Sequence, residues 1–140
     1  GYGVFPDFLV EPVTRLMTNS VSCTSVFSQM AAIAALEGPQ DSVAAMMEEF
    51  TKRRDLVVEG LNSLPGITCP VPKGAFYAFP NIRATGMSSQ EFANKALYEA
   101  GVALLAGTAF GAFGDGYIRI SFANSQENLL EAIERLRKIL

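Results

Sequence analysis

Residues 117–122 read Tyr-Ile-Arg-Ile-Ser-Phe, so that an apolar side chain stands at every second position. Because successive side chains of a β-strand point to opposite faces, this alternation predicts a strand with one buried and one open face. The apolar members are Ile118, Ile120 and Phe122. The open face then carries Arg119 between a tyrosine and a serine. An arginine in the middle of such a strand is costly to bury unless an anion pairs with it.

Arg119 is therefore the leading candidate for a binding residue. Its planar guanidinium matches a carboxylate through two parallel hydrogen bonds, and a strand holds a side chain more tightly than a loop does. The residues alone leave two other interpretations open. One is an ion pair with an Asp or Glu of the same chain, and the other is a solvated position.

Helical periodicity dominates the first half of the chain. We expect helices over residues 7–19, 24–37 and 41–64, the second of which ends at Gly38-Pro39. Pro12 has no backbone N–H and clashes in a helix interior, so the first helix is expected to begin at Pro12 or to kink there.

Two more helices are predicted in the second half. Ser88 and Glu91 have the spacing of a capping box, which opens a helix that runs to Gly101. The last helix begins at 124 or 125, and its charged residues predict two pairs four positions apart, Glu131 with Arg135 and Glu134 with Lys138.

The remaining segments read as strands and turns. Residues 67–69 and 75–79 are expected to form a hairpin, 102–105 a short strand, and 107–116 a glycine-rich loop whose two phenylalanines pack over something apolar. Strands of this local kind, mixed with four or five helices, favour an α/β fold of the α+β two-layer type. We expect a small, mostly antiparallel sheet with helices packed on one face.

Composition narrows the class of protein. Only 18% of the residues are charged, below the roughly 25% of typical soluble domains, so part of the apolar surface is expected to face another domain or subunit. A net charge of -3 without a basic cluster argues against nucleic acid as a partner. The apolar runs are far shorter than the roughly 20 residues of a membrane helix, which predicts a soluble, cytoplasmic protein with no membrane partner.

The absence of histidine excludes several chemistries. No Ser-His-Asp or Cys-His nucleophile system and no histidine-ligated zinc can be built from this chain, and its two cysteines are a poor metal set. We therefore expect no metal site. Any chemistry must come from a cofactor or from another segment.

Five short runs together resemble a known family. In order and spacing they resemble the C-terminal part of class I (fold type I) aminotransferases, notably the bacterial aspartate aminotransferase-like branch. The runs are Arg-Arg-Asp-Leu-Val at 53–57, Leu-Pro-Gly-Ile at 64–67, Pro-Lys-Gly-Ala-Phe-Tyr-Ala-Phe-Pro at 72–80, Gly-Val at 101–102 together with Gly-Thr-Ala-Phe-Gly at 107–111, and Tyr-Ile-Arg-Ile-Ser-Phe-Ala at 117–123.

The resemblance implies a homodimeric enzyme that uses pyridoxal 5'-phosphate to move an amino group between an amino acid and a 2-oxo acid. Arg119 takes the role of the family arginine that binds the substrate carboxylate, and Phe76 falls where an aromatic ring borders the site. The lysine that forms the Schiff base with the cofactor is expected upstream of Gly1, in an N-terminal cofactor-binding domain of the same chain. Residues 1–36 match the end of that large domain and the connecting helices, and residues 37–140 match the small C-terminal domain.

The same resemblance gives weaker implications. Residues 20–25 align with a family segment that approaches the partner subunit's site, although the usual Asn-Pro pair is missing, so Ser22 and Thr24 are candidate contacts there. The fragment alone is expected to bind no cofactor and to be inactive. Two alternatives stay open: a lyase or synthase of the same fold and cofactor, and a non-enzymatic domain for a small ligand or for dimerisation.

Overall fold

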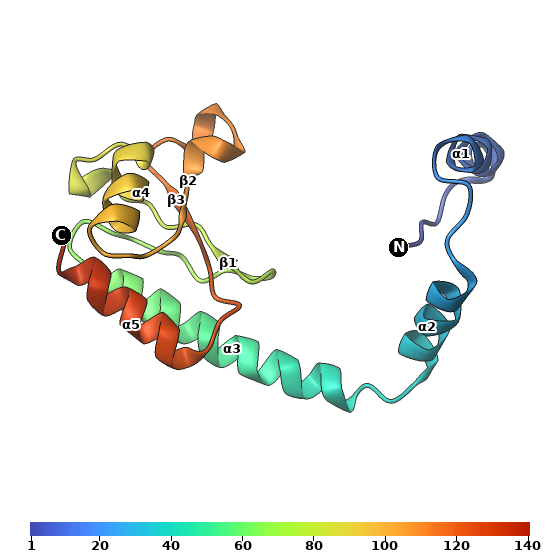
Figure 1. Cartoon of the computed structure of the whole chain (residues 1–140), viewed down its shortest axis with the longest axis horizontal. Helices are drawn as coiled ribbons and strands as arrows, with labels where there is room; N and C mark the ends of the chain where they lie inside the picture. The colour runs from blue at the N-terminus through green and yellow to red at the C-terminus, as the bar shows by residue number, and fades with distance from the viewer. The chain divides into compact units, whose positions relative to one another are not determined.

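The computed structural model describes residues 1–140 and divides into two units, Gly1–Ser42 and Val43–Leu140 (Figure 1). Five α-helices, three strands and three short 3-10 helices (η) follow one another along the chain. In order they are α1 (Asp7–Ser20), α2 (Val26–Glu37), α3 (Asp41–Asn62), β1 (Tyr77–Ala78), η1 (Arg83–Thr85), α4 (Ser89–Tyr98), β2 (Leu105–Ala106), η2 (Gly107–Phe110), η3 (Ala112–Gly114), β3 (Ile118–Ser121) and α5 (Gln126–Arg137).

The first unit contains α1, α2 and the first two residues of α3, and it has no core of its own, because none of its side chains is buried. Pro12 lies inside α1, which begins at Asp7. A start at Pro12, one of the two outcomes predicted for this proline, is therefore wrong. Pro6 supplies the extended residue before the helix, and Leu9 N–H already donates to the Pro6 carbonyl at 2.8 Å. None of the helices in the chain combines the length and the apolar character that crossing a membrane requires.

The second unit is built around a three-stranded antiparallel sheet with the order β1-β3-β2. β3 is the central strand. The register pairs Ala78 of β1 with Ile120 and Leu105 of β2 with Arg119. The predicted small antiparallel sheet is confirmed.

The hairpin predicted between 67–69 and 75–79 is wrong, because β1 pairs with β3 instead. The two segments share a single antiparallel bridge, between Thr68 and Asn81. Next to it, the Asn62 side chain replaces a strand partner: its Oδ1 accepts from Cys69 N–H at 2.8 Å and its Nδ2 donates to the Cys69 carbonyl at 2.9 Å. The strand predicted over 102–105 is also wrong except at Leu105: β2 spans Leu105–Ala106, and Val102 N–H donates instead to the Ala96 carbonyl in α4.

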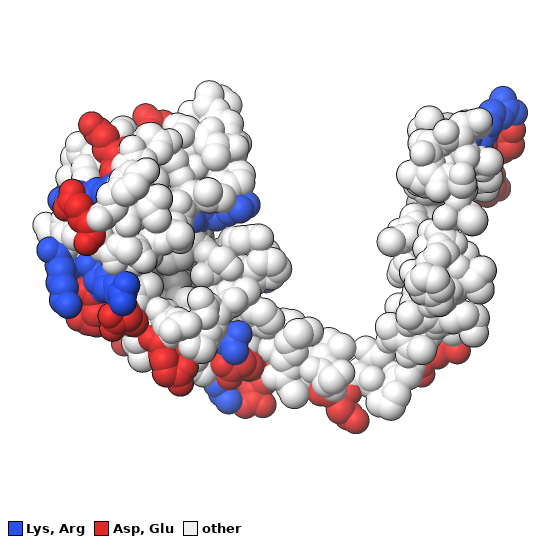
Figure 2. Space-filling model, viewed as in Figure 1, with Lys and Arg blue, Asp and Glu red and all other residues white.

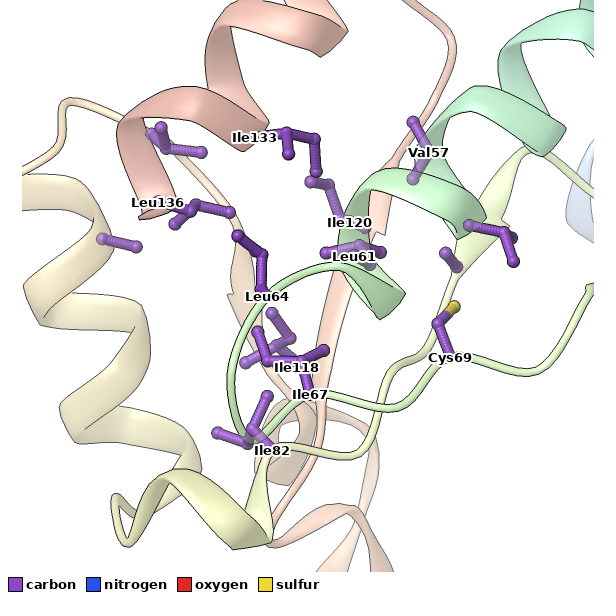
Figure 3. Close-up of a cluster of buried hydrophobic side chains, with 14 of the residues drawn as sticks. Val57, Leu61, Leu64, Ile67, Cys69, Ile82, Ile118, Ile120, Ile133 and Leu136 are labelled. Atoms are coloured by element: carbon purple, nitrogen blue, oxygen red, sulfur yellow. The ribbon is translucent and has the colours of Figure 1, made fainter. Parts of the chain in front are cut away.

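Three helices cover one face of the sheet and form the core with it, as predicted. Figure 3 shows side chains from α3, α5 and β3 converging there. The fully or almost fully buried members include Val57 and Leu61 of α3, Phe92 of α4, Ile118 and Ile120 of β3, and Ile133 and Leu136 of α5. Burial of this many apolar side chains is the main stabilising contribution to the unit.

The predicted capping box opens α4. Glu91 N–H donates to Ser88 Oγ at 3.3 Å, and Ser88 N–H donates to Glu91 Oε2 at 2.9 Å. Hydrogen bonds from the Ser88 side chain and then from its backbone hold the pKa of Glu91 below its ordinary value. α4 ends at Tyr98, three residues before the predicted Gly101.

Charged side chains gather along the edge of the second unit formed by α3 and α5, whereas the region of η2 and η3 is largely uncharged (Figure 2). On α5 the predicted pair of Glu131 with Arg135 forms at 2.8 Å. The predicted pair of Glu134 with Lys138 is wrong, because Glu134 lies 3.5 Å from Arg137, one position nearer. These exposed pairs contribute little to stability.

Candidate functional site

The site lies on the face of the sheet opposite the helices, and the glycine-rich loop folds over its edge. The loop forms η2 and η3. The backbones of Gly107 in η2 and Gly114 in η3 lie in close contact, because a Cβ on Gly107 would lie 2.1 Å from the Gly114 carbonyl oxygen. Gly107 N–H also donates to the Tyr117 carbonyl at 2.8 Å. This close approach, which only glycine allows, ties the loop to β3.

The two phenylalanines of the loop differ. The ring of Phe110 lies over the Arg119 guanidinium and meets the ring of Phe79 edge to face, with centroids 6.1 Å apart. Phe113 is 99% exposed. The expectation that the loop packs over something apolar is therefore correct for Phe110, whereas Phe113 has no apolar contact within this chain and its packing stays a prediction.

Arg119 projects from the middle of β3 and is only partly buried. Its guanidinium carbon Cζ lies 4.3 Å from the ring centroid of Tyr77 and 4.0 Å from that of Phe110. Both distances are well inside the roughly 6 Å range of a cation–π interaction. None of the ion pairs or side-chain hydrogen bonds of the chain includes its guanidinium, so the ion pair left open by the sequence does not form.

A second arginine on the same face serves as a comparison. Arg83 donates from Nη2 to the Asp115 carbonyl at 3.1 Å, and its Cζ lies 4.8 Å from the Tyr117 ring centroid. Tyr117 in turn stacks on Phe79, with centroids 5.4 Å apart and planes 13° from parallel. Arg83 is thus engaged with the backbone, whereas the N–H groups of Arg119 face no acceptor within the chain.

Phe76, predicted to border the site, packs on Tyr77, and Tyr77 is the ring that contacts Arg119. Its ring lies 4.4 Å from that of Tyr77 and 6.3 Å from that of Phe50. The direct neighbours of the guanidinium, Tyr77 and Phe110, were not singled out from the sequence. No sequence pattern gave this contact for Tyr77, because only the register of β1 with β3 places it on the same face of the sheet as Arg119.

The two candidate contacts to a partner subunit, Ser22 and Thr24, lie between α1 and α2 in the first unit. Both are exposed. Ser22 has φ 63°, a left-handed conformation that is uncommon outside glycine, and the Thr24 carbonyl accepts from Gln29 Nε2 at 2.8 Å. Their role stays a prediction.

The residues of this chain do not by themselves fit pyridoxal phosphate, because none of its lysines stands beside Arg119. Lys52 pairs with Glu48 at 2.8 Å on the exposed side of α3, and this hydrogen bond raises the pKa of its ammonium group. A raised pKa is the opposite of what a Schiff-base lysine needs. The others are Lys73 before β1, Lys95 on α4 and Lys138 at the end of α5.

Residues 1–136 match the model of the family described as aminotransferase class I and II, and the chain belongs to this family. It is 43% identical over 142 residues to the aspartate aminotransferase of Pyrococcus horikoshii, an alignment that covers 100% of this chain and 36% of that protein. It is 42% identical over 142 residues to aromatic-amino-acid aminotransferase 2 of Thermococcus litoralis, with the same two coverages, 100% and 36%.

The crystal structure of an aromatic aminotransferase from Pyrococcus horikoshii superposes on 96% of this chain and 36% of that one, with a TM-score of 0.91 and 40% identity. The chain thus spans about a third of the length of the curated relatives it matches. The predicted resemblance to the C-terminal part of class I aminotransferases is confirmed, and so is the fold class.

Proposed function

We propose that this chain is the C-terminal part of an aminotransferase and that Arg119 binds the carboxylate of the amino acid and 2-oxo acid substrates. The observation that carries the proposal is a guanidinium that is held on a strand, partly buried, and free of any acidic partner in the chain. Membership of the aminotransferase family gives that guanidinium a natural anion, because both substrate classes carry a carboxylate.

Arg119 acts in this proposal by binding and orientation. Its N–H groups lie at the edge of a plane and match the two oxygens of a carboxylate. Partial burial strengthens this interaction over the same contact in water. Fixing the carboxylate orients the rest of the substrate toward the reacting groups. Pyridoxal phosphate supplies the electron sink for the reaction and is held by the part of the enzyme outside this chain.

The same proposal assigns the remaining segments. Residues 1–36 are the end of the large domain with its connecting helices, and residues 37–140 are the small domain. Apolar side chains of the first unit are unusually exposed, with Phe8 at 75% and Phe27 at 79%, which supports cover by the N-terminal domain or by the second subunit of a homodimer.

Ser22 is proposed to contact the active site of the partner subunit. If it does, Ser22→Gly, which relieves the left-handed backbone and removes the hydroxyl, should raise KM in the full-length enzyme. A cytoplasmic location stays a prediction.

The decisive experiment replaces Arg119 in the full-length enzyme and measures transfer between paired amino acids and 2-oxo acids. Hydrogen bonds to charged groups contribute about 1.5 to 3 kcal/mol each, so Arg119→Leu is expected to lower kcat/KM roughly a hundredfold or more. Arg119→Lys keeps the charge but loses the planar fork, and we expect it to recover only part of that loss.

Arg83→Leu is the matched control, because Arg83 lies on the same face and already donates to a backbone carbonyl. Its kcat/KM is expected to stay within about threefold of the parent enzyme, as for most changes away from a binding contact. The absorbance of bound cofactor should be the same in all three variants. An Arg119→Leu enzyme with parental kcat/KM would overturn the assignment.

A further inference from the structure

The two rings that contact Arg119 come from segments far apart in the chain. Tyr77 belongs to β1, and Phe110 ends η2, which follows directly after β2. Because β3 lies between β1 and β2, the two rings reach the guanidinium from opposite flanks of the strand that carries it. The guanidinium therefore lies between them, with its Cζ 4.3 Å from one ring centroid and 4.0 Å from the other.

Each ring is itself held in place by other aromatic side chains. Tyr77 packs on Phe76, with centroids 4.4 Å apart. Phe110 meets Phe79 edge to face at 6.1 Å, and Phe79 stacks on Tyr117 at 5.4 Å. Contacts of this kind restrict ring orientation beyond simple burial. The rings of Tyr77 and Phe110 are thus each held in place by neighbouring aromatic side chains.

We propose that Tyr77 and Phe110 are positioning residues that clamp the Arg119 guanidinium and leave only its edge open to a carboxylate. This inference rests on the proposed function of Arg119. With one ring centroid 4.3 Å and the other 4.0 Å from Cζ, the rings occupy the space beside the group on two sides, and we infer that an anion approaches the N–H donors at its edge. That approach is the one in which a carboxylate binds through two parallel hydrogen bonds.

The clamp also accounts for the missing acidic partner. An Asp or Glu beside Arg119 would occupy the N–H donors that the substrate carboxylate needs. An aromatic face attracts the cation without using those donors. The rings therefore hold the side chain in advance of binding, which lowers the loss of rotamer freedom when the substrate arrives.

The test uses the full-length enzyme with Tyr77→Leu, Tyr77→Phe, Phe110→Leu and Phe110→Tyr. Each leucine variant is expected to raise KM for the amino acid roughly threefold to thirtyfold, with a smaller change in kcat. The two variants that keep a ring should stay near the parent. Phe113→Leu is the matched control, because Phe113 lies in the same loop, is 99% exposed and touches no part of the clamp, so its KM should not change.

A double-mutant cycle separates positioning from general damage. In an Arg119→Leu background, Phe110→Leu and Tyr77→Leu are expected to cause no further loss, because the residue through which they act is gone. Additive losses in that background, or unchanged KM in both leucine variants while Arg119→Leu is impaired, would overturn the clamp and leave the proposed function intact. Parental activity in Arg119→Leu alone would overturn the proposed function.

If Tyr77→Leu does not fold, Phe110→Leu alone tests the clamp, since Phe110 is 47% exposed and its loss leaves the core unchanged.

Discussion

The two faces of β3 divide stability and binding between alternate residues of one short strand. On the helix-covered face, Ile118 is fully buried and Ile120 is 5% exposed. On the open face, Arg119 is partly buried and Ser121 is exposed. Neighbours along the chain therefore differ in what they contact. Removing a side chain from one face should affect mainly folding, and removing one from the other should affect mainly binding.

Packing explains why the faces differ. The covered face is filled by apolar side chains of three helices, which pack closely, and no buried side-chain nitrogen or oxygen is left without a hydrogen-bond partner. The open face is built from flat rings around a cation, and rings leave the edge of a guanidinium accessible. Arg119 is therefore held on a strand that the core makes rigid, while the guanidinium itself lies outside that core.

The largest expected effect on stability is that of Ile118→Ala. Isoleucine-to-alanine changes in a core cost about 2 to 5 kcal/mol, and a fully buried site such as this one should lie in the middle of that range. Guanidinium chloride unfolding, followed by the near-ultraviolet circular dichroism of tyrosine, measures it. The chain has no tryptophan, and its two partly buried tyrosines, Tyr77 and Tyr117, both lie in the second unit, so the signal reports mainly on that unit.

Arg119→Leu is the matched change on the other face and should shift the free energy of unfolding by less than about 1 kcal/mol, since it breaks no ion pair. The comparison predicts opposite rankings for the two variants, with Ile118→Ala the less stable and Arg119→Leu the less active as full-length enzyme. A large loss of stability in Arg119→Leu would show that the open face also supports the fold.

A smaller effect is expected where the glycine loop meets β3. A Cβ at residue 107 would overlap the Gly114 carbonyl oxygen and come within 2.7 Å of the Tyr117 carbonyl oxygen, so Gly107→Ala must displace backbone. We expect a loss of about 1 to 3 kcal/mol, as for other overpacked sites. In the full-length enzyme KM should rise as well, because η2 carries Phe110.

Gly74→Ala is the control, because a Cβ there meets nothing within 4 Å. It should change neither stability nor KM measurably. Equal effects in the two alanine variants would mean that the close approach of Gly107 to Gly114 does not hold the loop.

Local patterns predicted much of this fold because their physical causes are local. The alternation around Arg119 gave the two faces of β3, and the spacing of Ser88 and Glu91 gave the start of α4. Gly38-Pro39 gave the end of α2. In each case the deciding contacts lie within a few residues along the chain.

The errors arose where a distant residue supplied the partner. The expected hairpin fails because the Asn62 side chain occupies the backbone groups of Cys69 and because β1 pairs with β3. The site shows the same limit. Arg119 was identified from its own strand, whereas its contact with Phe110 depends on how the loop between β2 and β3 closes, which no short pattern specifies.

The smallest expected effect on stability is that of Glu91→Gln, a change in the capping box of α4, away from both faces of β3. Glu91→Gln keeps an acceptor in the capping box and removes only the charge. The pKa of Glu91 in the folded state lies below its ordinary value of 4.5, because the Ser88 hydroxyl and then its N–H hydrogen-bond to the carboxylate. A lowered pKa means that the charge stabilises the fold above pH 4.5 and that this contribution disappears as the pH falls through the folded-state pKa.

Glu91→Gln should therefore be slightly less stable than the parent at pH 7, and the two midpoints of thermal unfolding should converge as the pH falls below 4.5. Glu99→Gln at the opposite end of α4 is the control, because a negative charge there faces the negative end of the helix dipole. Its removal should be neutral or slightly stabilising at pH 7. A difference between the parent and Glu91→Gln that persists at low pH would place the effect in packing rather than in the charge of the cap.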